Sequence, residues 1–387
     1  MNKIDRTAVA LVFLIVALTS RAHAIGNIRM GQMEIHPYVA LQEEFSDNIY
    51  KTATDLKRDS ITILTPGVSI LWPSGRHRLE AEYYVIDRRY DTYPGEDTTD
   101  KYAKGLLGLQ FGSYFNLTVS DAYAKSHEPR DISSTGFIEV FRTNAASASA
   151  TYQLAGRSKV QVDYTVTSWN FVTSNFRDRD EKLVAGYIYY RFLPKTSTFI
   201  EYDRKMVDFT LATTTLDNYM DTLSLGFTWD IDGSSKGTIK AGRTAKDFED
   251  PAEKDFTVWT WSVKVNHNFS DLTTATIIGS RDVNETNFSG TSYFITTGAY
   301  ADLTHKFASK MAFVVRGSYG TGVYSNAVAP STTVREDKTN MLGAGLKYFM
   351  KDWLEFGADY NKRNRDSNIN VNDYRETLYI LSTNLTF

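Results

Sequence analysis

The sequence predicts an all-β fold, a transmembrane antiparallel up-and-down β-barrel of about 18 strands, with 16 strands as the alternative. Three observations support this prediction: an export signal at the N-terminus, a repeat of about 40 residues in which short turns alternate with longer polar segments, and strands with one apolar and one polar face. The composition agrees, because 24 Tyr, 22 Phe, 6 Trp and 24 Gly against only 8 Pro are typical of many strands joined by tight turns.

The first 24 residues have the features of a cleavable signal peptide. Lys3 and Arg6 precede an uncharged stretch at residues 7–20, and Ala22-His23-Ala24 is a small-residue cleavage site. The uncharged stretch is too short to span a bilayer. We therefore expect residues 1–24 to be a signal peptide and residues 25–387 to form a barrel in the outer membrane of a Gram-negative bacterium.

Composition also excludes several kinds of site. The chain has no cysteine, so a disulfide framework, a thiol catalyst and a CxxCH haem site are ruled out. Its 43 basic and 46 acidic residues give a net charge of −3, which does not indicate a nucleic-acid partner. Beyond the signal no apolar run reaches the length of a transmembrane helix, and a spanning chain without helices must close its sheet so that every backbone group is paired.

Tight-turn signals recur along the chain at intervals of 37 to 44 residues. They are WPSGR at 72–76, FGSY at 111–114, LAGR at 154–157, LPKT at 193–196, DIDGSSK at 230–236, FSDL at 269–272, FASK at 307–310 and MKDW at 350–353. Longer polar segments lie between them at 47–58, 92–99, 127–136, 172–179, 209–218, 248–254, 283–292, 325–336 and 364–372. The pattern predicts nine hairpins, with short periplasmic turns and long outer loops. A soluble propeller or solenoid is the alternative, because blades also repeat at this period.

Individual strands alternate with period two. Residues 258–269 place Trp259, Trp261 and Val263 on one face, and residues 222–231 and 353–361 alternate in the same way. The registers of 137–152 and 182–192 stay open. Aromatic residues gather near the tight turns and again beside the long segments, which is typical of the two interfacial girdles of a membrane barrel and favours it over a soluble sheet.

The chain ends on a strand whose last residue is aromatic. Tyr379, Leu381, Leu385 and Phe387 share one side of this strand. We expect it to pair with the strand near residues 34–46 and so close the barrel. The alternating terminus resembles the signal that the outer-membrane barrel assembly machinery reads, which makes that machinery an expected partner together with outer-membrane lipid.

Three stretches resemble the putative β-barrel porin 2 family: EEFSDNIY at 43–50, LTPGVSIL at 64–71 and LEAEYYVIDRRYDTY at 79–93. Outer-membrane proteins of this family are often encoded beside exopolysaccharide biosynthesis genes. The resemblance implies an outer-membrane barrel with a role in polysaccharide passage. Polysaccharide and periplasmic export components would then be further partners.

About 18 strands at a spacing of roughly 4.8 Å and a tilt of about 40° enclose a backbone circle of about 18 Å radius. The lumen is either open or narrowed by loops that fold into it. By alternation, the charged residues that face it are Glu80, Glu82, Asp163, Glu201, Asp203, Lys240, Lys264, Arg316, Lys347, Glu355 and Asp359. Rings of charge in a pore tune selectivity, although inward charges also pair with one another on the wall.

A second set of basic residues lies toward the outer ends of the strands: Arg88, Arg89, Arg204, Arg243, Arg281 and Arg363. They are candidates to line the mouth and attract acidic polysaccharide. Alternatively they are rim charges balanced by neighbouring carboxylates. Tyr187, Tyr189 and Tyr300 are the candidate inward aromatics on which sugar rings could stack.

No catalytic set emerges. The six histidines show neither HExxH nor HxH spacing, no G-x-S-x-G elbow occurs, and His127 with Glu128 is expected as a surface pair in a loop. Glu80 and Glu82 resemble a glycosidase pair, but strand alternation alone produces that spacing. We expect no enzymatic activity, no metal site and no cofactor.

These observations favour an outer-membrane pore that takes part in the export or passage of exopolysaccharide. One alternative is a general diffusion porin for small solutes. Another, from a different class, is a non-catalytic barrel that anchors or sheathes a periplasmic or extracellular partner.

Overall fold

The computed structural model describes residues 28–128, 130, 137–211, 216–231, 233–288, 290–327 and 332–387. The predicted signal peptide, residues 1–24, lies outside the described residues. Nearly all described residues belong to strands or to the connections between them, and the only helical elements described are the single 3-10 turns η1 (Pro94–Glu96), η2 (Asn175–Arg177) and η3 (Asn370–Asn372). Within the described ranges, no helix is long and apolar enough to cross a membrane.

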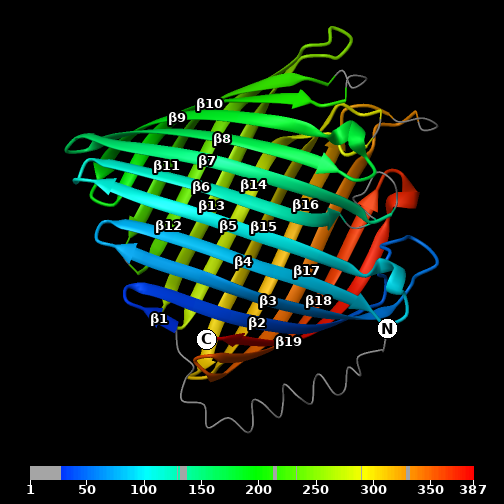
Figure 1. Cartoon of the computed structure of the whole chain (residues 1–387). Coiled ribbons are helices and arrows are strands. Elements are labelled where there is room, and N and C mark those ends of the chain that lie inside the picture. Colours follow the sequence, from blue (N-terminus) through cyan, green and yellow to red (C-terminus); the bar gives the residue numbers. More distant parts are fainter. Residues whose placement is uncertain are drawn as a thin grey trace.

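Eighteen antiparallel strands form one closed barrel (Figure 1). They are β2 (Met33–Ser46), β3 (Asp59–Ser74), β4 (His77–Tyr90), β5 (Thr98–Phe111), β6 (Phe115–Glu128), β7 (Glu139–Ala155), β8 (Ser158–Phe171), β9 (Arg179–Leu193), β10 (Thr196–Phe209), β11 (Asn218–Ile231), β12 (Ser235–Phe248), β13 (Phe256–Ser270), β14 (Thr273–Glu285), β15 (Tyr293–Ala308), β16 (Met311–Tyr324), β17 (Glu336–Lys351), β18 (Leu354–Ser367) and β19 (Tyr374–Thr386). Each strand pairs with the next along the chain. The predicted 18-strand up-and-down barrel is therefore confirmed, and the 16-strand alternative is excluded.

The last strand closes the barrel against the first long one. In this closure Tyr379 lies opposite Phe45 and Thr386 lies opposite Tyr38. The backbone N–H of Phe387 donates to the carbonyl oxygen of Pro37 at 3.0 Å, so pairing continues to the final residue. The short strand β1 (Ile28–Met30) pairs with the beginning of β2, on residues that β19 does not reach. The predicted pairing of the C-terminal strand is confirmed.

Short turns and long connections lie at opposite ends of the barrel, which we call the turn end and the loop end. Figure 1 shows the turn end on the left and the loop end on the right. In three tight turns Gly75, Gly112 and Gly233 have φ of +60°, +62° and +69°, in the left-handed region where a side chain would be strained. The predicted tight turns occur where the sequence repeat places them. The long connections overlap the predicted segments, but residues 283–285 and 364–367 belong to β14 and β18, and residues 131–136 lie outside the described residues.

The two faces of the wall differ in chemistry. On β11 the side chains of Leu223 and Leu225 point outward and are 59% and 55% exposed, whereas Ser224 between them is buried on the inner face. On β9, one of the strands whose register stayed open, Val184 and Ile188 point outward and Tyr187 points inward. An apolar outside and a polar inside are what a lipid-solvated barrel requires.

The backbone ladder is interrupted at the loop end between β13 and β14. Pairing of these strands begins at Trp261 opposite Arg281, so residues 256–260 of β13 pair with β12 alone. On the outside, Arg281 Nε donates to the carbonyl oxygen of Trp259 at 3.1 Å. On the inside, the rings of Phe256 and Tyr293 stack with centroids 4.1 Å apart. Backbone hydrogen bonds to β14 are therefore missing along residues 256–260 of β13, and side chains cover this gap on both faces. We call the gap the β13–β14 seam.

Candidate functional site in the barrel interior

The strand registers place the charged residues predicted for the lumen on the inner face. Most of them lie in pairs on neighbouring or near-neighbouring strands. Lys240 Nζ is 2.7 Å from both carboxylate oxygens of Glu201, and Arg316 Nη2 is 2.6 Å from Asp359 Oδ1. Lys347 is paired with Glu355 at 2.9 Å. The inner wall is therefore a surface of mutually neutralised charge rather than a ring of one sign.

The other predicted lumen residues have polar neighbours of different kinds. Arg78 Nε lies 3.2 Å from Glu80, and the hydroxyl of Tyr38 donates to Glu82 at 3.0 Å. Ser149 donates to Asp163 at 2.6 Å. Lys264 is exposed on the inner face of β13. Glu80 and Glu82 thus have separate partners on separate strands and do not form an isolated carboxylate pair.

A cavity of about 340 Å³ opens on the inner wall between β9 and β14. Glu201, Asp203, Lys205 and Lys240 supply charged groups to it, and Tyr187 supplies an aromatic ring. The cavity also reaches Trp261, beside the β13–β14 seam. Three charged residues predicted for the lumen, Glu201, Asp203 and Lys240, therefore line one cavity together with Tyr187, a predicted inward aromatic.

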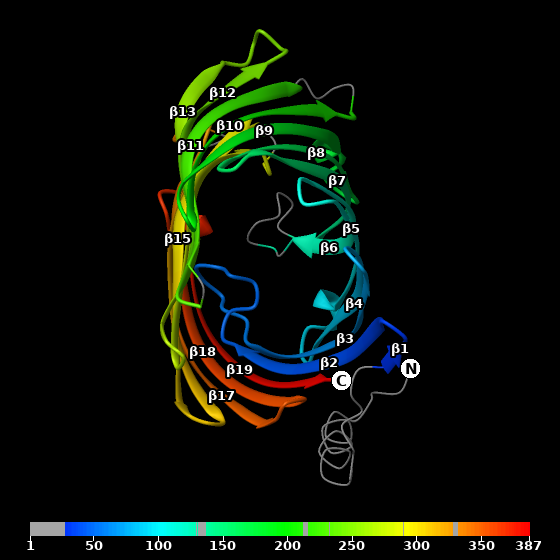
Figure 2. The ribbon, with the colours of Figure 1, turned by 90° about the vertical axis from the view of Figure 1, so that its left-hand side faces the viewer.

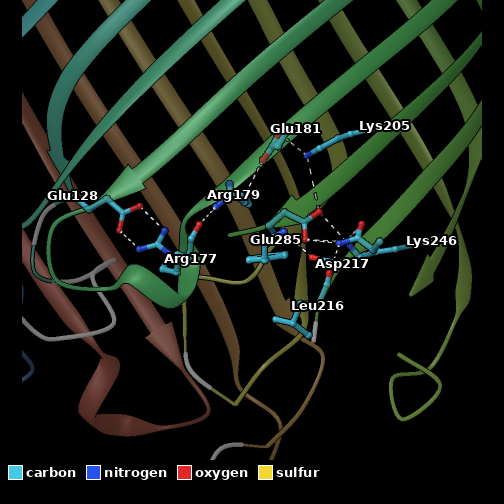
Figure 3. A network of polar contacts seen from close by, with 11 residues as sticks. Glu128, Arg177, Arg179, Glu181, Lys205, Leu216, Asp217, Lys246 and Glu285 are labelled. Atoms are coloured by element: carbon cyan, nitrogen blue, oxygen red, sulfur yellow. Dashed lines mark hydrogen bonds and ion pairs between the residues drawn. The ribbon is translucent and has the colours of Figure 1, made fainter. Parts of the chain in front are cut away.

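A buried ionic network follows the inner wall toward the loop end (Figure 3). Arg177 donates two hydrogen bonds to Glu128, at 2.7 and 2.8 Å. Glu181 accepts from Arg179 at 2.7 Å and lies 3.0 Å from Lys205 Nζ. Because burial of a charge is costly unless it is paired and hydrogen-bonded, the network stabilises the geometry of this wall only while it is complete.

The network ends at the pair formed by Lys246 and Glu285. Lys246 Nζ lies 2.8 Å from Glu285 Oε1 and also donates to Asn218 Oδ1 at 2.8 Å. Glu285 in turn lies 4.0 Å from Lys205, which joins the two parts of the network. It connects β9, β10, β12 and β14, so it spans strands that are not all neighbours.

Sequence reasoning did not predict this network. His127 and Glu128 were expected as a surface pair in a loop, which is wrong: both belong to β6, where His127 Nδ1 lies 2.8 Å from Asp100 Oδ1 and Glu128 binds Arg177. Arg179 and Glu181 stand at inward positions of β9, so the alternation of that strand would have identified them had its register been fixed. Glu285 is at the very end of β14, where alternation no longer predicts direction.

The predicted rim arginines divide between the two faces. Arg88 and Arg363 point inward and contact Asp100 at 2.7 Å and Glu376 at 3.5 Å. Arg89, Arg204, Arg243 and Arg281 stand at outward positions of their strands. These four therefore lie on the outside of the wall and do not line the mouth. The reason is parity, since adjacent residues of a strand face opposite sides.

Aromatic rings lie on the inner wall in stacked groups. Tyr187 and Tyr189 stack with centroids 5.9 Å apart, and Phe199 of β10 lies 5.2 Å from Tyr189. Tyr300 is also at an inward position, on β15. Two further groups were not anticipated: Tyr84 stacked on Tyr102 at 4.7 Å, and Phe141 with Trp169 and Phe171. The inner wall thus offers several flat apolar faces among hydrogen-bonding groups.

Three connections pack together at the loop end. The ring of Tyr50 lies 5.5 Å from that of Tyr93, and the guanidinium of Arg130 lies 4.5 Å from the Tyr50 ring. Arg130 also forms an ion pair with the buried carboxylate of Glu96. Seen from the turn end in Figure 2, the loop between β2 and β3 lies within the outline of the barrel. These contacts favour a mouth narrowed on one side over a fully open one.

Comparison with known proteins gives a family and a fold. A family model described as "Putative beta-barrel porin 2" matches residues 22–387. Among solved structures, the chain is similar to the outer membrane protein OpdK from Pseudomonas aeruginosa, with 11% identity, a TM-score of 0.50, and coverage of 91% of this chain and 99% of that one. It is also similar to OccAB4 from Acinetobacter baumannii, with 11% identity, a TM-score of 0.51, and coverage of 93% and 99%. No curated protein sequence matches the chain.

Proposed function

The chain belongs to the "Putative beta-barrel porin 2" family, and on this premise we propose that it is an outer-membrane pore through which exopolysaccharide, or fragments of it, passes. The family and the barrel fold point to the outer membrane of a Gram-negative cell. Polysaccharide and the periplasmic components that deliver it would be its partners, and we expect no catalytic step.

The observation that carries this proposal is the alternation of stacked rings and paired charges on the inner wall. A sugar ring has an apolar face of C–H groups and an edge of hydroxyls, so it packs on an aromatic ring and hydrogen-bonds to polar groups beside it. Tyr187 and Tyr189 supply such a face beside Glu201, which stands opposite Tyr187 on β10, and both Glu201 and Lys240 border the same cavity as Tyr187. Because the wall charges are already neutralised by one another, a weakly charged polymer can slide past them without being held by a strong field.

The test combines a cellular and an electrical measurement. In a strain that lacks this protein, we expect less surface polysaccharide, with restoration by the parent gene and weaker restoration by the Tyr187→Ala/Tyr189→Ala variant. Tyr190→Ala/Tyr202→Ala is the matched control, because both rings point outward and are exposed. In planar bilayers, fragments of the polysaccharide should block the ion current of the parent and the control more strongly than that of the inward variant. Equal block in all three proteins, with unchanged surface polysaccharide in the deletion strain, would contradict the proposal.

A general diffusion porin for small solutes is the second candidate function. It is favoured by the ion pairs Lys240–Glu201 and Arg316–Asp359, which could orient a small charged solute. One solved structure of similar fold is OpdK with vanillate. This candidate predicts that small organic acids pass at a rate that the rings do not influence. The anchor or sheath alternative predicts no ion current at all.

A further inference from the structure

A groove of about 240 Å³ lies on the wall formed by β17, β18 and β19; we call it the β17–β19 groove. It is lined by Asn340, Leu342, Lys362, Asn364 and Arg375. The register makes these residues neighbours, because Asn364 stands opposite Asn340 on one side and Arg375 on the other, and Leu342 stands opposite Lys362. The groove is therefore one continuous patch on three adjacent strands.

The β17–β19 groove faces away from the lumen. Leu342 is 70% exposed, as expected for an outward side chain. The residues on either side of Lys362 point inward, since Asn361 is buried and Arg363 contacts the buried carboxylate of Glu376. Lys362 itself is exposed. The groove is thus on the surface that meets the membrane.

The position of the β17–β19 groove along the barrel axis coincides with the expected level of the lipid headgroups. Two residues closer to the turn end, Tyr360 and Tyr379 form an outward aromatic pair with centroids 5.3 Å apart. The next outward row contains Leu346 and Leu381, both well exposed. Toward the loop end, in the next outward row beyond the groove, Lys338 stands opposite Asp366 in the strand register. Amphipathic rings favour the headgroup level, so the groove lies at the headgroups on the loop-end side.

In the described part of the chain, the two cations of the groove lack the carboxylate partner that some other outward cations of this barrel have. Arg89 is held by Asp87 at 2.5 Å, and Lys182 by Asp208 at 2.9 Å. Among the residues that the structure describes, neither Lys362 nor Arg375 has a carboxylate within ion-pair distance. Both would therefore gain from an anion supplied from outside the protein.

We propose that the β17–β19 groove binds the phosphorylated headgroup of a glycolipid of the outer leaflet, such as lipid A. A guanidinium binds phosphate oxygens through two parallel hydrogen bonds and an ammonium binds them as a compact charge, so Arg375 and Lys362 together suit a phosphate. The amides of Asn340 and Asn364 add donors for phosphate or sugar hydroxyls. Leu342 lies beside them as the apolar contact for the first methylene groups of an acyl chain. This inference is independent of what passes through the lumen.

The test measures binding of lipid A, and of lipid A from which the phosphates have been removed, to the purified full-length barrel by native mass spectrometry in detergent. We expect the parent protein to retain phosphorylated lipid A at least about tenfold more strongly than the dephosphorylated form. The Lys362→Ala/Arg375→Ala variant should lose this preference. The matched control Arg89→Ala/Lys182→Ala removes two outward cations that are already paired, and it should keep the preference. The shift in gel mobility on boiling confirms that each variant is folded.

Several outcomes would overturn the proposal. One is equal binding of phosphorylated and dephosphorylated lipid A by the parent protein, a result that does not depend on any variant. Another is a loss of preference of equal size in the groove variant and the control, which would indicate general surface charge. A third is the complete displacement of lipid A by millimolar inorganic phosphate at constant ionic strength. That result would show that the acyl chains contribute nothing to binding, and it would assign the groove to free anions instead of lipid.

Discussion

Lys246 Nζ lies 2.8 Å from Glu285 Oε1, and this ion pair joins β12 to β14 across β13, at the β13–β14 seam. The side chain of Lys246 is 0% exposed and that of Glu285 is 2% exposed. The pair therefore replaces, on the inside of the wall, a connection that the backbone does not make there.

Replacement of Lys246 by Met should destabilise the barrel. It leaves the carboxylate of Glu285 buried without its closest partner, and breaking a buried pair from one side costs about 3–5 kcal/mol. Urea unfolding in detergent micelles, followed by tryptophan fluorescence, measures the change. Lys236→Met is the control, because that side chain is 75% exposed and its ion pair should contribute little. A Lys246 variant as stable as this control would show that the seam does not depend on the pair.

Ion selectivity should respond to the lumen pair Glu201–Lys240. Glu201→Gln leaves Lys240 without its partner on the inner wall, so we expect the reversal potential in a salt gradient to shift toward anion selectivity. Lys240→Gln should shift it the opposite way. Asp208→Asn changes an outward carboxylate on the same strand and should leave the reversal potential unchanged. Shifts of the same sign in both lumen variants would contradict the assignment of these residues to the pore.

The C-terminal residue should matter for assembly more than for the stability of the folded barrel. The ring of Phe387 stacks on Trp353 with centroids 6.4 Å apart, while its backbone N–H already bonds to Pro37. We predict that Phe387→Ala lowers the amount of heat-modifiable barrel in the outer membrane. Trp353→Ala removes the stacking partner without altering the terminal signal, and it should assemble at the level of the parent. Equal assembly of all three proteins would remove the proposed role of the terminal aromatic.

Opening of the loop contact at the mouth should raise the conductance. Arg130 contacts the ring of Tyr50 and the buried carboxylate of Glu96, so Arg130→Ala removes its contacts with two loops that pack at the loop end. We expect larger single-channel current steps with more frequent fluctuations. Arg58→Ala, in the same connection as Tyr50 but with an exposed side chain, is the comparison. A mouth that is unaffected by Arg130→Ala would show that these loops do not restrict the pore.

Much of the fold was predictable because lipid imposes a simple rule on every strand. A residue such as Leu223 meets acyl chains and the next one, Ser224, meets the interior, so period two is visible without knowledge of the neighbouring strand. The turn signals were equally local, as the positive φ of Gly75 illustrates. The strand count, the closure and the inward direction of Glu201 or Arg316 all follow from these local signals.

The contacts that could not be predicted from the sequence depend on which strands are neighbours and on the position of each residue along the barrel axis. The contact of Lys246 with Glu285 skips a strand, and no periodicity in the sequence encodes it. Arg88 and Arg89 were grouped as mouth residues although alternation sends them to opposite faces, so their roles required the register as well as the charge. The β17–β19 groove likewise exists only because Lys362 and Arg375, 13 positions apart, meet on adjacent strands.

The most direct test of the central claim, that this barrel is a water-filled pore, is the ion current that the purified and folded protein carries across a planar lipid bilayer. The structure predicts discrete current steps of uniform size, because the barrel is closed and its inner wall is lined by polar and ion-paired side chains. Barrel that shifts in mobility on boiling, inserts into the bilayer and yet carries no current would contradict the claim.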